Sequence, residues 1–549
     1  MARIRRLGLP AAALLLAIQC PISIASRFQQ PIVGAGAAAR DHSTPGNPFT
    51  DEFGEYITDL LEEWKVPGVS IAVIDGQEGY GFAILPDTPA TPETLWHGGS
   101  TTKAFVDATL AHLISNGSYH VLEGGWSTPI SSIIRDDFVL QDEWSTNHIT
   151  LEDAASHRTG MPRHDLSWAR LRDGKRVSNQ DIVRNLRNLP PTAPPRVIWQ
   201  YCNLMYITLA HVIETVTGEG LKDALRDVIW GPLGMTSTYL DRQEAEDRGE
   251  PLAHGYVWDP KTKEYSPVSD TVRESSGAGG IVSNVLDYSK WLKCLLYQTG
   301  PFSNSTHAEI RKPRMVEETE PSRGNDVELY GLGWGRTVLH GQVVYSHNGG
   351  TGAFGTDVYW LPDLQYAVAM FGNTAGSSNS VEALVIRKLI EDKLKIPADQ
   401  RVDLSSGLKK QVEDHRYKLD HAAEILYPNL PSPTLPPSKK PSSLVGTYVD
   451  AGYGTLQIKE AVDPEDASST VLVGDRGDMI MPFDFVLRHV SGDYWIMYLG
   501  SSKAPRELGD AVAAKFSFGA DGQASGLEVT WDQARPGLKE VKVLFNKME

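Results

Sequence analysis

The chain has 549 residues, of which 41% are hydrophobic and 22% charged, and its formal net charge is −17. This is a globular composition, long enough for one large enzyme domain and an accessory domain. The acidic balance argues against nucleic acid and anionic membranes as partners, and three cysteines without a CxxC pair or an HExxH motif argue against a disulfide scaffold or a zinc site.

The N-terminus has the pattern of a secretory signal peptide. A basic start is followed by a short apolar run over residues 7–20 and by small residues that offer cleavage after Ala25. A signal anchor is the alternative, but the apolar run is too short to span a bilayer comfortably. We expect residues 1–25 to be a cleaved signal peptide, residues 26–47 a flexible leader, and the mature protein to be secreted.

Two asparagines and two cysteines bear on the environment of the mature chain. Asn116 and Asn304 begin N-glycosylation sequons, which matter if the host is a secreting eukaryote. Cys202 and Cys294 remain after signal cleavage, and one disulfide between them is an open alternative. Because Cys202 lies inside a motif described below, we expect it to be buried and reduced.

Helical and strand patterns alternate over residues 48–400, which we assign to one catalytic domain. Apolar side chains recur at helical spacing up to Trp64, with Thr50 or Asp51 as the N-cap. The later patterns predict a buried strand and its hairpin partner over residues 69–85, an amphipathic helix over 196–218, another over 280–296 opened by Ser283, and two or three antiparallel strands over 342–373. A helical cluster inserted between two parts of an antiparallel sheet is an α+β arrangement.

The last part of the chain has a different pattern. Residues 428–443 are rich in Pro and Ser, which indicates a semi-rigid connection, and we place the linker at residues 401–441. Short strands separated by Gly, Asp and Asn turns follow, and their spacing predicts an all-β module of about eight strands over residues 442–549.

A serine and a lysine stand three residues apart where a glycine pair meets the start of a helical pattern. One helical turn places Ser100 and Lys103 on the same side. A serine needs a base to become a nucleophile, and a lysine can be that base if burial or positive potential at a helix N-terminus lowers its pKa. The alternative is a capping serine with a solvated lysine, and the same spacing recurs at Ser406 and Lys409.

Two later motifs complete a catalytic pattern. Tyr201 and Asn203 open the helix over 196–218, where Tyr201 would act with Lys103 as general base and Asn203 would hold a substrate carbonyl or amide. His347 is followed by Asn348 and then by a glycine pair on a predicted strand, which would let a substrate backbone approach and would expose backbone N–H groups. Taken singly, a buried tyrosine, a capping asparagine and a hairpin turn are the alternatives, but the order of the three motifs favours catalysis.

These motifs resemble those of the serine β-lactamase-related family, which includes class C β-lactamases, DD-peptidases, D-aminopeptidases and family VIII carboxylesterases. The stretches "ASHRTGMPRHD" (155–165), "GPLGMTSTYL" (231–240), "GAGGIVSNVLDYSKWL" (277–292) and "YGLGWG" (330–335) add to the resemblance. The likeness runs over residues 48–395, and the C-terminal module more weakly resembles the lipocalin-like domain of some members. The fold implied is an antiparallel sheet with an inserted helical cluster, of β-lactamase and penicillin-binding-protein type, plus a lipocalin-like β domain.

The resemblance also implies the reacting groups. Ser100 would be the acylated nucleophile, and Lys103 and Tyr201 would deprotonate it and later activate the water or alcohol that releases the acyl group. The backbone N–H groups of Ser100 and Gly350 would form the oxyanion hole.

The substrate-binding residues implied are Asn203, His347 and Gly349. His347 stands where the β-lactamases have the lysine of a Lys-Thr-Gly motif. A histidine is mostly uncharged near neutral pH, so recognition of a β-lactam carboxylate should weaken. We therefore rank a peptidase or an esterase above an efficient β-lactamase.

The sequence thus predicts a secreted serine hydrolase that acts through an acyl-enzyme on amide or ester bonds, with no metal or organic cofactor. Its partner would be a small-molecule or peptide substrate; nucleic acid, and a membrane after signal cleavage, are not expected, and an oligomer could form through the C-terminal domain. The alternatives are an acyltransferase on a secondary metabolite, a β-lactamase, a catalytically silent binding protein, and a β module that binds a small apolar ligand.

Overall fold

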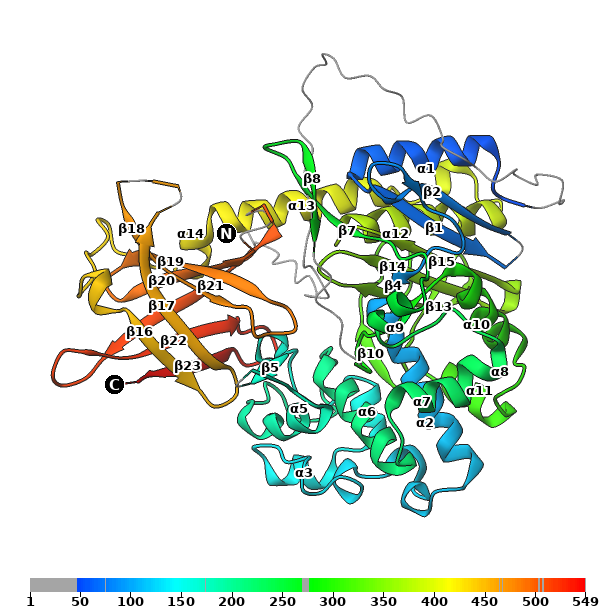
Figure 1. The fold of residues 1–549 in the computed structure, drawn as a ribbon, viewed down its shortest axis with the longest axis horizontal. Helices are drawn as coiled ribbons and strands as arrows, with labels where there is room; N and C mark the ends of the chain where they lie inside the picture. The colour runs from blue at the N-terminus through cyan, green and yellow to red at the C-terminus, as the bar shows by residue number, and fades with distance from the viewer. Residues whose placement is uncertain are drawn as a thin grey trace, which may run out of the picture.

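The computed structural model describes residues 47–548 apart from residues 75, 173, 269–275, 464, 467, 502–503 and 506–507. The predicted signal peptide and all but the last residue of the leader lie outside the described residues. Figure 1 shows two domains, the first built around a large sheet and the second a barrel of strands.

The first domain contains a nine-stranded antiparallel sheet. Its strands lie in the order β10 (Met315–Glu318), β11 (Glu328–Tyr330), β12 (Gly335–Leu339), β13 (Gln342–Gly350), β14 (Gly355–Leu361), β15 (Tyr366–Gly372), β1 (Gly68–Val73), β2 (Gly76–Ile84) and β3 (Thr88–Pro89). The first strand of the chain pairs with the last strand of the domain, with Val69 opposite Gly372. Every helix between β3 and β10 is therefore inserted between two parts of one sheet, and the predicted α+β arrangement is confirmed.

Helices cover both faces of this sheet. On one face, α1 (Asp51–Trp64) and α12 (Ser377–Lys393) pack on each other and on the strands around an apolar cluster that includes Ile57, Val69 and Val385. On the other face, α10 (Val285–Tyr297) packs on β15 and β1, beside α2 (Thr102–Asn116) and α6 (Asn203–Thr217) (Figure 1). The remaining elements of the insertion are α3 (Glu143–His148), α4 (Leu151–Ala155), β5 (Leu171–Arg172), β6 (Lys175–Arg176), α5 (Asn179–Asn185), α7 (Leu221–Leu225), α8 (Gly231–Leu233), α9 (Arg242–Asp247), β7 (Gly255–Asp259), β8 (Glu264–Val268) and α11 (Asn304–Arg311), with the pair β4 (Trp96–His97) and β9 (Val282–Ser283).

Helix caps confirm one prediction and correct another. The side chain of Thr50 accepts a hydrogen bond from the Phe53 amide at 3.2 Å, so Thr50 caps α1. Ser283 does not open α10, because it lies in β9 and its hydroxyl contacts that of Thr238 at 2.7 Å. Asn284 is the cap instead, and its side chain accepts from the amide of Asp287 at 2.9 Å.

The second domain is a closed barrel of eight antiparallel strands, as the spacing of its turns predicted. They are β16 (Gly446–Asp450), β17 (Gly454–Val462), β18 (Thr470–Arg476), β19 (Phe483–Ser491), β20 (Tyr494–Gly500), β21 (Asp510–Phe518), β22 (Ala524–Asp532) and β23 (Val541–Lys547). Pairing of β16 with β23 closes it. The interior holds buried rings in contact with one another: Phe516 lies 5.9 Å from Tyr448 and 5.7 Å from Trp495 between ring centroids. This packing argues against the alternative of an apolar ligand cavity inside the barrel.

The connection between the domains is more ordered than a linker. Residues 401–441 contain α13 (Leu404–Asp420) and α14 (Ala422–Leu426), and α13 runs from α12 toward the barrel (Figure 1). Val412 and Leu419 are buried on α13, and their spacing with Leu404 and Leu408 is the helical signal that the Pro- and Ser-rich stretch after it obscured. The longest part of this connection without a helix or a strand runs from Tyr427 to Lys440.

A buried carboxyl group lies on the inner side of α12, behind the strand that carries the histidine motif. Glu382 is fully buried, and its Oε2 accepts from Asn379 Nδ2 at 2.9 Å. The same amide of Asn379 lies 3.0 Å from the carbonyl oxygen of Gly349. Burial and the charge of Asp357 raise the pKa of Glu382 well above its usual value.

Replacing Glu382 by glutamine should stabilise the protein at neutral pH. A carboxyl group whose folded-state pKa is raised favours folding below its unfolded pKa, and this contribution is lost as the pH rises toward the folded-state pKa. Glu382→Gln removes the cost of burying an ionisable group, so the free energy of unfolding should rise at pH 7 and rise less at pH 4.5. Urea unfolding at several pH values measures this.

Glu391 on the same helix provides the matched control. It is buried too, but its carboxylate lies 3.8 Å from Arg401 Nε and 3.4 Å from His340 Nε2. Glu391→Gln takes the charged partner from Arg401 and should destabilise. Equal destabilisation by both substitutions would mean that Glu382 is also an ionised, paired group.

Candidate active site

Ser100 lies in a single 3-10 turn, Gly99–Thr101, between β4 and α2. The residue at the N-cap of α2 is Thr101, so Ser100 is not the capping serine that the alternative interpretation required. Its side chain remains half-buried, whereas Lys103 is fully buried. A hydroxyl group that is accessible beside a buried amine is the arrangement that nucleophilic catalysis needs.

Two glycine pairs, Gly98–Gly99 before Ser100 and Gly349–Gly350 at the end of β13, allow the turn at Ser100 to contact this strand. Gly99 has φ of 51°, and a Cβ there would lie 2.7 Å from the amide nitrogen of Gly350. A Cβ on Gly349 would lie 2.1 Å from the carbonyl oxygen of Gly98 and 3.2 Å from the amide nitrogen of Ser100. Only glycine permits this approach, and it brings the amides of Ser100 and Gly350 together from segments far apart in the chain.

The amino group of Lys103 has three polar neighbours. Its Nζ lies 2.6 Å from the carbonyl oxygen of Ala278, 2.8 Å from Asn203 Oδ1 and 3.0 Å from Ser100 Oγ. The first two atoms are acceptors only, so each takes one N–H of the amine. A neutral amine has two N–H groups and one lone pair, and the lone pair is therefore left for the hydroxyl proton of Ser100.

The lowered pKa of Lys103 favours the neutral amine. Burial lowers its pKa well below the ordinary lysine value, and the positive charge of Arg163 lowers it further, while Asp165 opposes the shift. Asn203 is held in the required orientation, because its Nδ2 donates to Asp165 Oδ1 at 3.0 Å and so turns Oδ1 toward Lys103.

Tyr201 lies beside Lys103 and is influenced by Ser100. Lys103 Nζ lies 4.7 Å from the centroid of the Tyr201 ring, and Ser100 is among the groups that act on the pKa of the phenol. Burial raises the pKa of Tyr201 above its usual range, although the guanidinium of Arg163, 4.8 Å from the ring centroid, opposes this. The raised pKa keeps the phenol protonated at neutral pH. Lys103 Nζ, 3.0 Å from Ser100 Oγ, is a basic group within reach of the serine proton.

His347 has its two ring nitrogens occupied inside the protein. Nδ1 lies 2.6 Å from the carbonyl oxygen of Asn348, so Nδ1 carries the proton and donates it. Nε2 then accepts from the hydroxyl of Tyr330 at 2.9 Å. Burial, with a smaller effect from Lys103, lowers the pKa of His347 to about 3, and the ring is neutral at physiological pH. Its predicted role as a direct substrate contact thus has no free nitrogen to support it, and its contacts tie β13 to Tyr330.

Comparison with known proteins decides the family. A family model described as Beta-lactamase matches residues 53–390, more than half of the chain. The chain belongs to the β-lactamase family. A second model, described as a domain of unknown function, matches residues 430–543 of this β-lactamase-family protein, which include most of the barrel.

Curated relatives and solved structures agree with this. The β-lactamase-family chain is 37% identical to an unguisins hydrolase of Aspergillus campestris, over 91% of this chain and 92% of the relative. It is 35% identical to an unguisins hydrolase of Aspergillus violaceofuscus, over 90% of each chain. The octameric penicillin-binding protein homologue from Pyrococcus abyssi shares the fold at 18% identity, with a TM-score of 0.56 over 90% of this chain and 99% of that one. The protein is a serine hydrolase of the β-lactamase family, with a C-terminal barrel of lipocalin-like form.

Several residues of this β-lactamase-family site had no assigned role in the sequence. Arg163 and Asp165 contact Tyr201 and Asn203 as described, and His157 accepts from the amide of Cys202 at 3.1 Å with its ring centroid 4.3 Å from that of Tyr201. All three lie in "ASHRTGMPRHD", which the resemblance had singled out as a segment. No periodicity assigns roles within a loop, because the partners lie 38 to 45 residues further along the chain.

The other predicted residues lie away from the reacting groups. Asn116 and Asn304 are exposed, at the C-terminal end of α2 and the first position of α11. Cys202 and Cys294 are both buried and free, so the disulfide alternative is excluded. Lys409, in the second Ser-x-x-Lys pattern, lies on α13 and pairs with Glu63.

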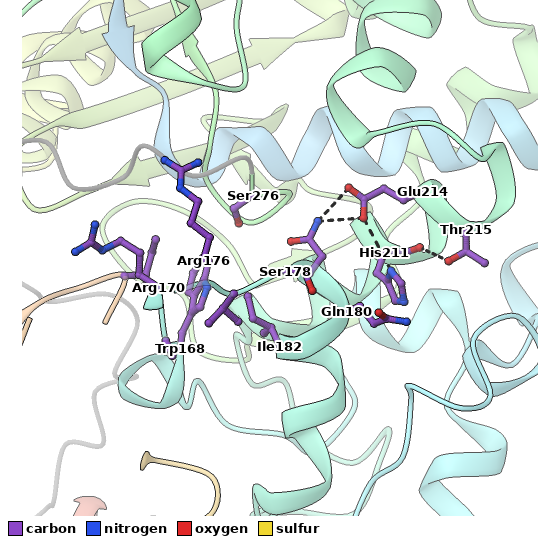
Figure 2. Close-up of a pocket in the computed structure, with 14 residues that line it drawn as sticks. Trp168, Arg170, Arg176, Ser178, Gln180, Ile182, His211, Glu214, Thr215 and Ser276 are labelled. Carbon is purple, nitrogen blue, oxygen red and sulfur yellow. Dashed lines mark hydrogen bonds and ion pairs between the residues drawn. The ribbon is translucent and has the colours of Figure 1, made fainter. Parts of the chain in front are cut away.

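A cavity of about 530 Å³ lies between the inserted elements and the barrel. Ser276 lines it, two residues before the Ala278 carbonyl that accepts from Lys103. Figure 2 shows Trp168 and Glu214 on opposite sides, and Ile480 of the barrel also lines it. The cavity is thus partly apolar and partly charged, and both domains contribute to it. Within the described residues, no cluster of three metal-ligating side chains and no helix long and apolar enough to cross a bilayer is found.

Proposed function

We propose that the protein hydrolyses an amide or ester bond through an acyl-enzyme on Ser100. One observation carries the proposal: Lys103 Nζ lies within hydrogen-bond distance of Asn203 Oδ1, the Ala278 carbonyl oxygen and Ser100 Oγ, so that a neutral amine that donates to the first two turns its lone pair to the Ser100 hydroxyl. A serine whose proton has an acceptor 3.0 Å away is an activated nucleophile.

In the acylation step, Ser100 Oγ forms a bond to the substrate carbonyl carbon and its proton passes to Lys103 Nζ. The carbonyl π electrons move onto oxygen, where the N–H groups of Ser100 and Gly350 would stabilise the negative charge. The bond to the leaving group then breaks, and Lys103 gives the proton to the departing amine or alkoxide. Neutral Lys103 and acylated Ser100 remain.

In the second step, a water molecule gives a proton to Lys103 and attacks the acyl carbon. The bond between that carbon and Ser100 Oγ breaks, the proton returns to Oγ, and a carboxylic acid leaves. Arg163 keeps Lys103 free to accept this proton, since its charge lowers the pKa of the amine in both steps.

The substrate class follows from the relatives and from His347. Two relatives that span nine-tenths of this chain are unguisins hydrolases, and we propose a unguisin-type compound as the substrate. A β-lactam is disfavoured, because the His347 ring is neutral and cannot offer a charge to a carboxylate.

A substrate panel tests the proposal. We expect turnover of a unguisin-type compound and of p-nitrophenyl butyrate, and kcat/KM for a chromogenic cephalosporin lower by about 100-fold or more, the value of a lost charge-assisted hydrogen bond. A D-Ala p-nitroanilide separates an aminopeptidase from these. Preferred turnover of the cephalosporin would contradict the ranking, and no turnover with no acyl adduct would contradict the hydrolase proposal itself.

We also propose that the protein is secreted and glycosylated. The N-terminal pattern supports secretion, and the exposure of Asn116 and Asn304 supports glycan attachment. Mass spectrometry of the protein from its native host, before and after glycosidase treatment, tests both; an unmodified chain that begins at Met1 would contradict both.

A further inference from the structure

The barrel is docked on the catalytic domain by main-chain hydrogen bonds. The amides of Arg170 and Leu171 donate to the carbonyl oxygen of Asp478 in the barrel, at 2.8 and 3.0 Å. In the other direction, the amide of Ile480 in the barrel donates to the carbonyl oxygen of Trp168 at 3.0 Å. Asn185 Nδ2 donates to another barrel carbonyl at 2.9 Å. These contacts gather on residues 164–192, which lie against the barrel in Figure 1 near the labels β5 and α5. Bonds to backbone atoms give this contact a fixed geometry.

One of the contacts joins two buried side chains. The hydroxyl of Tyr453, in the turn between β16 and β17, lies 2.7 Å from His164 Nδ1, and His164 Nε2 lies 2.9 Å from the carbonyl oxygen of Pro190. Nε2 must donate to the carbonyl, so Nδ1 is the acceptor of the Tyr453 hydroxyl proton. Both side chains are at most 5% exposed.

Tyr453 and His164 are each fixed by further contacts within their own domain. The ring of Tyr453 stacks on Trp531 with centroids 5.5 Å apart, and its amide donates to Asp450 Oδ1 at 2.8 Å. His164 has φ of 48°, a left-handed conformation that is unfavourable for a non-glycine residue. The bonds to Tyr453 and Pro190 offset that cost and fix the backbone at this point.

The two residues beside His164 in the chain are those that support the reacting groups. Arg163 lies over the ring of Tyr201 and pairs with Asp165 at 2.8 Å. Asp165 orients Asn203, which contacts Lys103. A rotation of the backbone at His164 would therefore move the cation that lowers the pKa of Lys103 and the carboxylate that orients its neighbour.

We propose that Tyr453 of the C-terminal barrel is a positioning residue of the active site, which acts through His164 to hold Arg163 and Asp165 against Tyr201 and Asn203. The proposal rests on the proposed function. It gives the barrel a direct part in positioning the reacting groups.

The test compares four full-length proteins: wild type, Tyr453→Phe, His164→Asn and the double variant. Asparagine is chosen because it tolerates the left-handed conformation. A fluorophosphonate probe, followed by intact-mass spectrometry, measures how fast Ser100 is modified. We expect the maximal rate of modification to fall by about five- to tenfold in each single variant, the effect of one lost buried hydrogen bond, with the probe concentration at half-maximal rate unchanged. The double variant should be no slower than the slower single variant, because both remove the same link.

Tyr448→Phe is the matched control. Its hydroxyl is also buried and donates to a carbonyl, that of Leu444, at 2.7 Å inside the barrel. This variant should lose similar thermal stability to Tyr453→Phe and keep the wild-type modification rate. Wild-type rates in Tyr453→Phe, or additive effects in the double variant, would overturn the proposal.

Hydrogen exchange separates this inference from the proposed function. Amides of residues 158–168 should exchange faster in Tyr453→Phe and not in Tyr448→Phe, whether or not the probe reacts. A wild-type protein that the probe does not modify would contradict the hydrolase proposal alone. Unchanged exchange in residues 158–168 would overturn the positioning role of Tyr453.

Discussion

Ser100→Ala should abolish turnover of every substrate that the wild-type protein accepts, by about 10⁴-fold or more. The reason is geometric: Ser100 Oγ is the hydroxyl that lies 3.0 Å from Nζ of Lys103. Alanine leaves Lys103 in place and removes only the atom that is acylated. Measured rates with p-nitrophenyl butyrate and a unguisin-type compound should fall together.

The chain contains its own control for this substitution. Ser406 stands in the same Ser-x-x-Lys pattern, but it is exposed on α13. Ser406→Ala should keep full activity. Turnover in Ser100→Ala within about tenfold of wild type would mean that another group is the nucleophile.

Lys103→Arg should be as inactive as Lys103→Ala, with a loss of about 10³- to 10⁴-fold in kcat/KM. Arginine keeps a positive charge and hydrogen-bond donors, but it cannot lose its proton at any pH of interest. If Lys103 acts by accepting the proton of Ser100, the charge is no substitute for the base. An arginine variant within about tenfold of wild type would show that Lys103 acts only as a cation.

The pH dependence of kcat/KM for the wild-type protein is a second test of Lys103 as the base. Burial and Arg163 lower the pKa of Lys103, so the amine is unprotonated well below pH 10.5, the ordinary value. As the pH falls through the pKa of the folded state, Lys103 takes up a proton and kcat/KM should fall with it. Arg163→Gln should move this acid limb to higher pH, since it removes a charge that disfavours the ammonium form. Lys409→Arg, on α13, should change neither rate nor profile.

Much of the fold and the main reacting pair could be predicted from local patterns. The spacing of Ser100 and Lys103 needs only one helical turn, and the order of strands and helices sufficed for the inserted α+β arrangement. Tyr201 and Asn203 were found because they open a helix and match a family motif. These features depend on residues that are neighbours in the chain.

The supporting contacts could not be predicted, because they join loops through the tertiary fold. Nothing local shows that Asp165 orients Asn203, or that both nitrogens of His347 are used by Tyr330 and the backbone. The same holds for Tyr453, which lies 289 residues after His164. The opening of α10 was misassigned to Ser283 for a related reason, since its hydroxyl is used by a neighbouring segment and Asn284 caps the helix.

The most direct test of the account is intact-mass spectrometry of protein quenched during turnover of p-nitrophenyl butyrate. The account predicts one added butyryl group, mapped by peptide sequencing to Ser100, present in wild type and absent in Ser100→Ala. An adduct that persists in Ser100→Ala, or an adduct mapped to another residue, would contradict it.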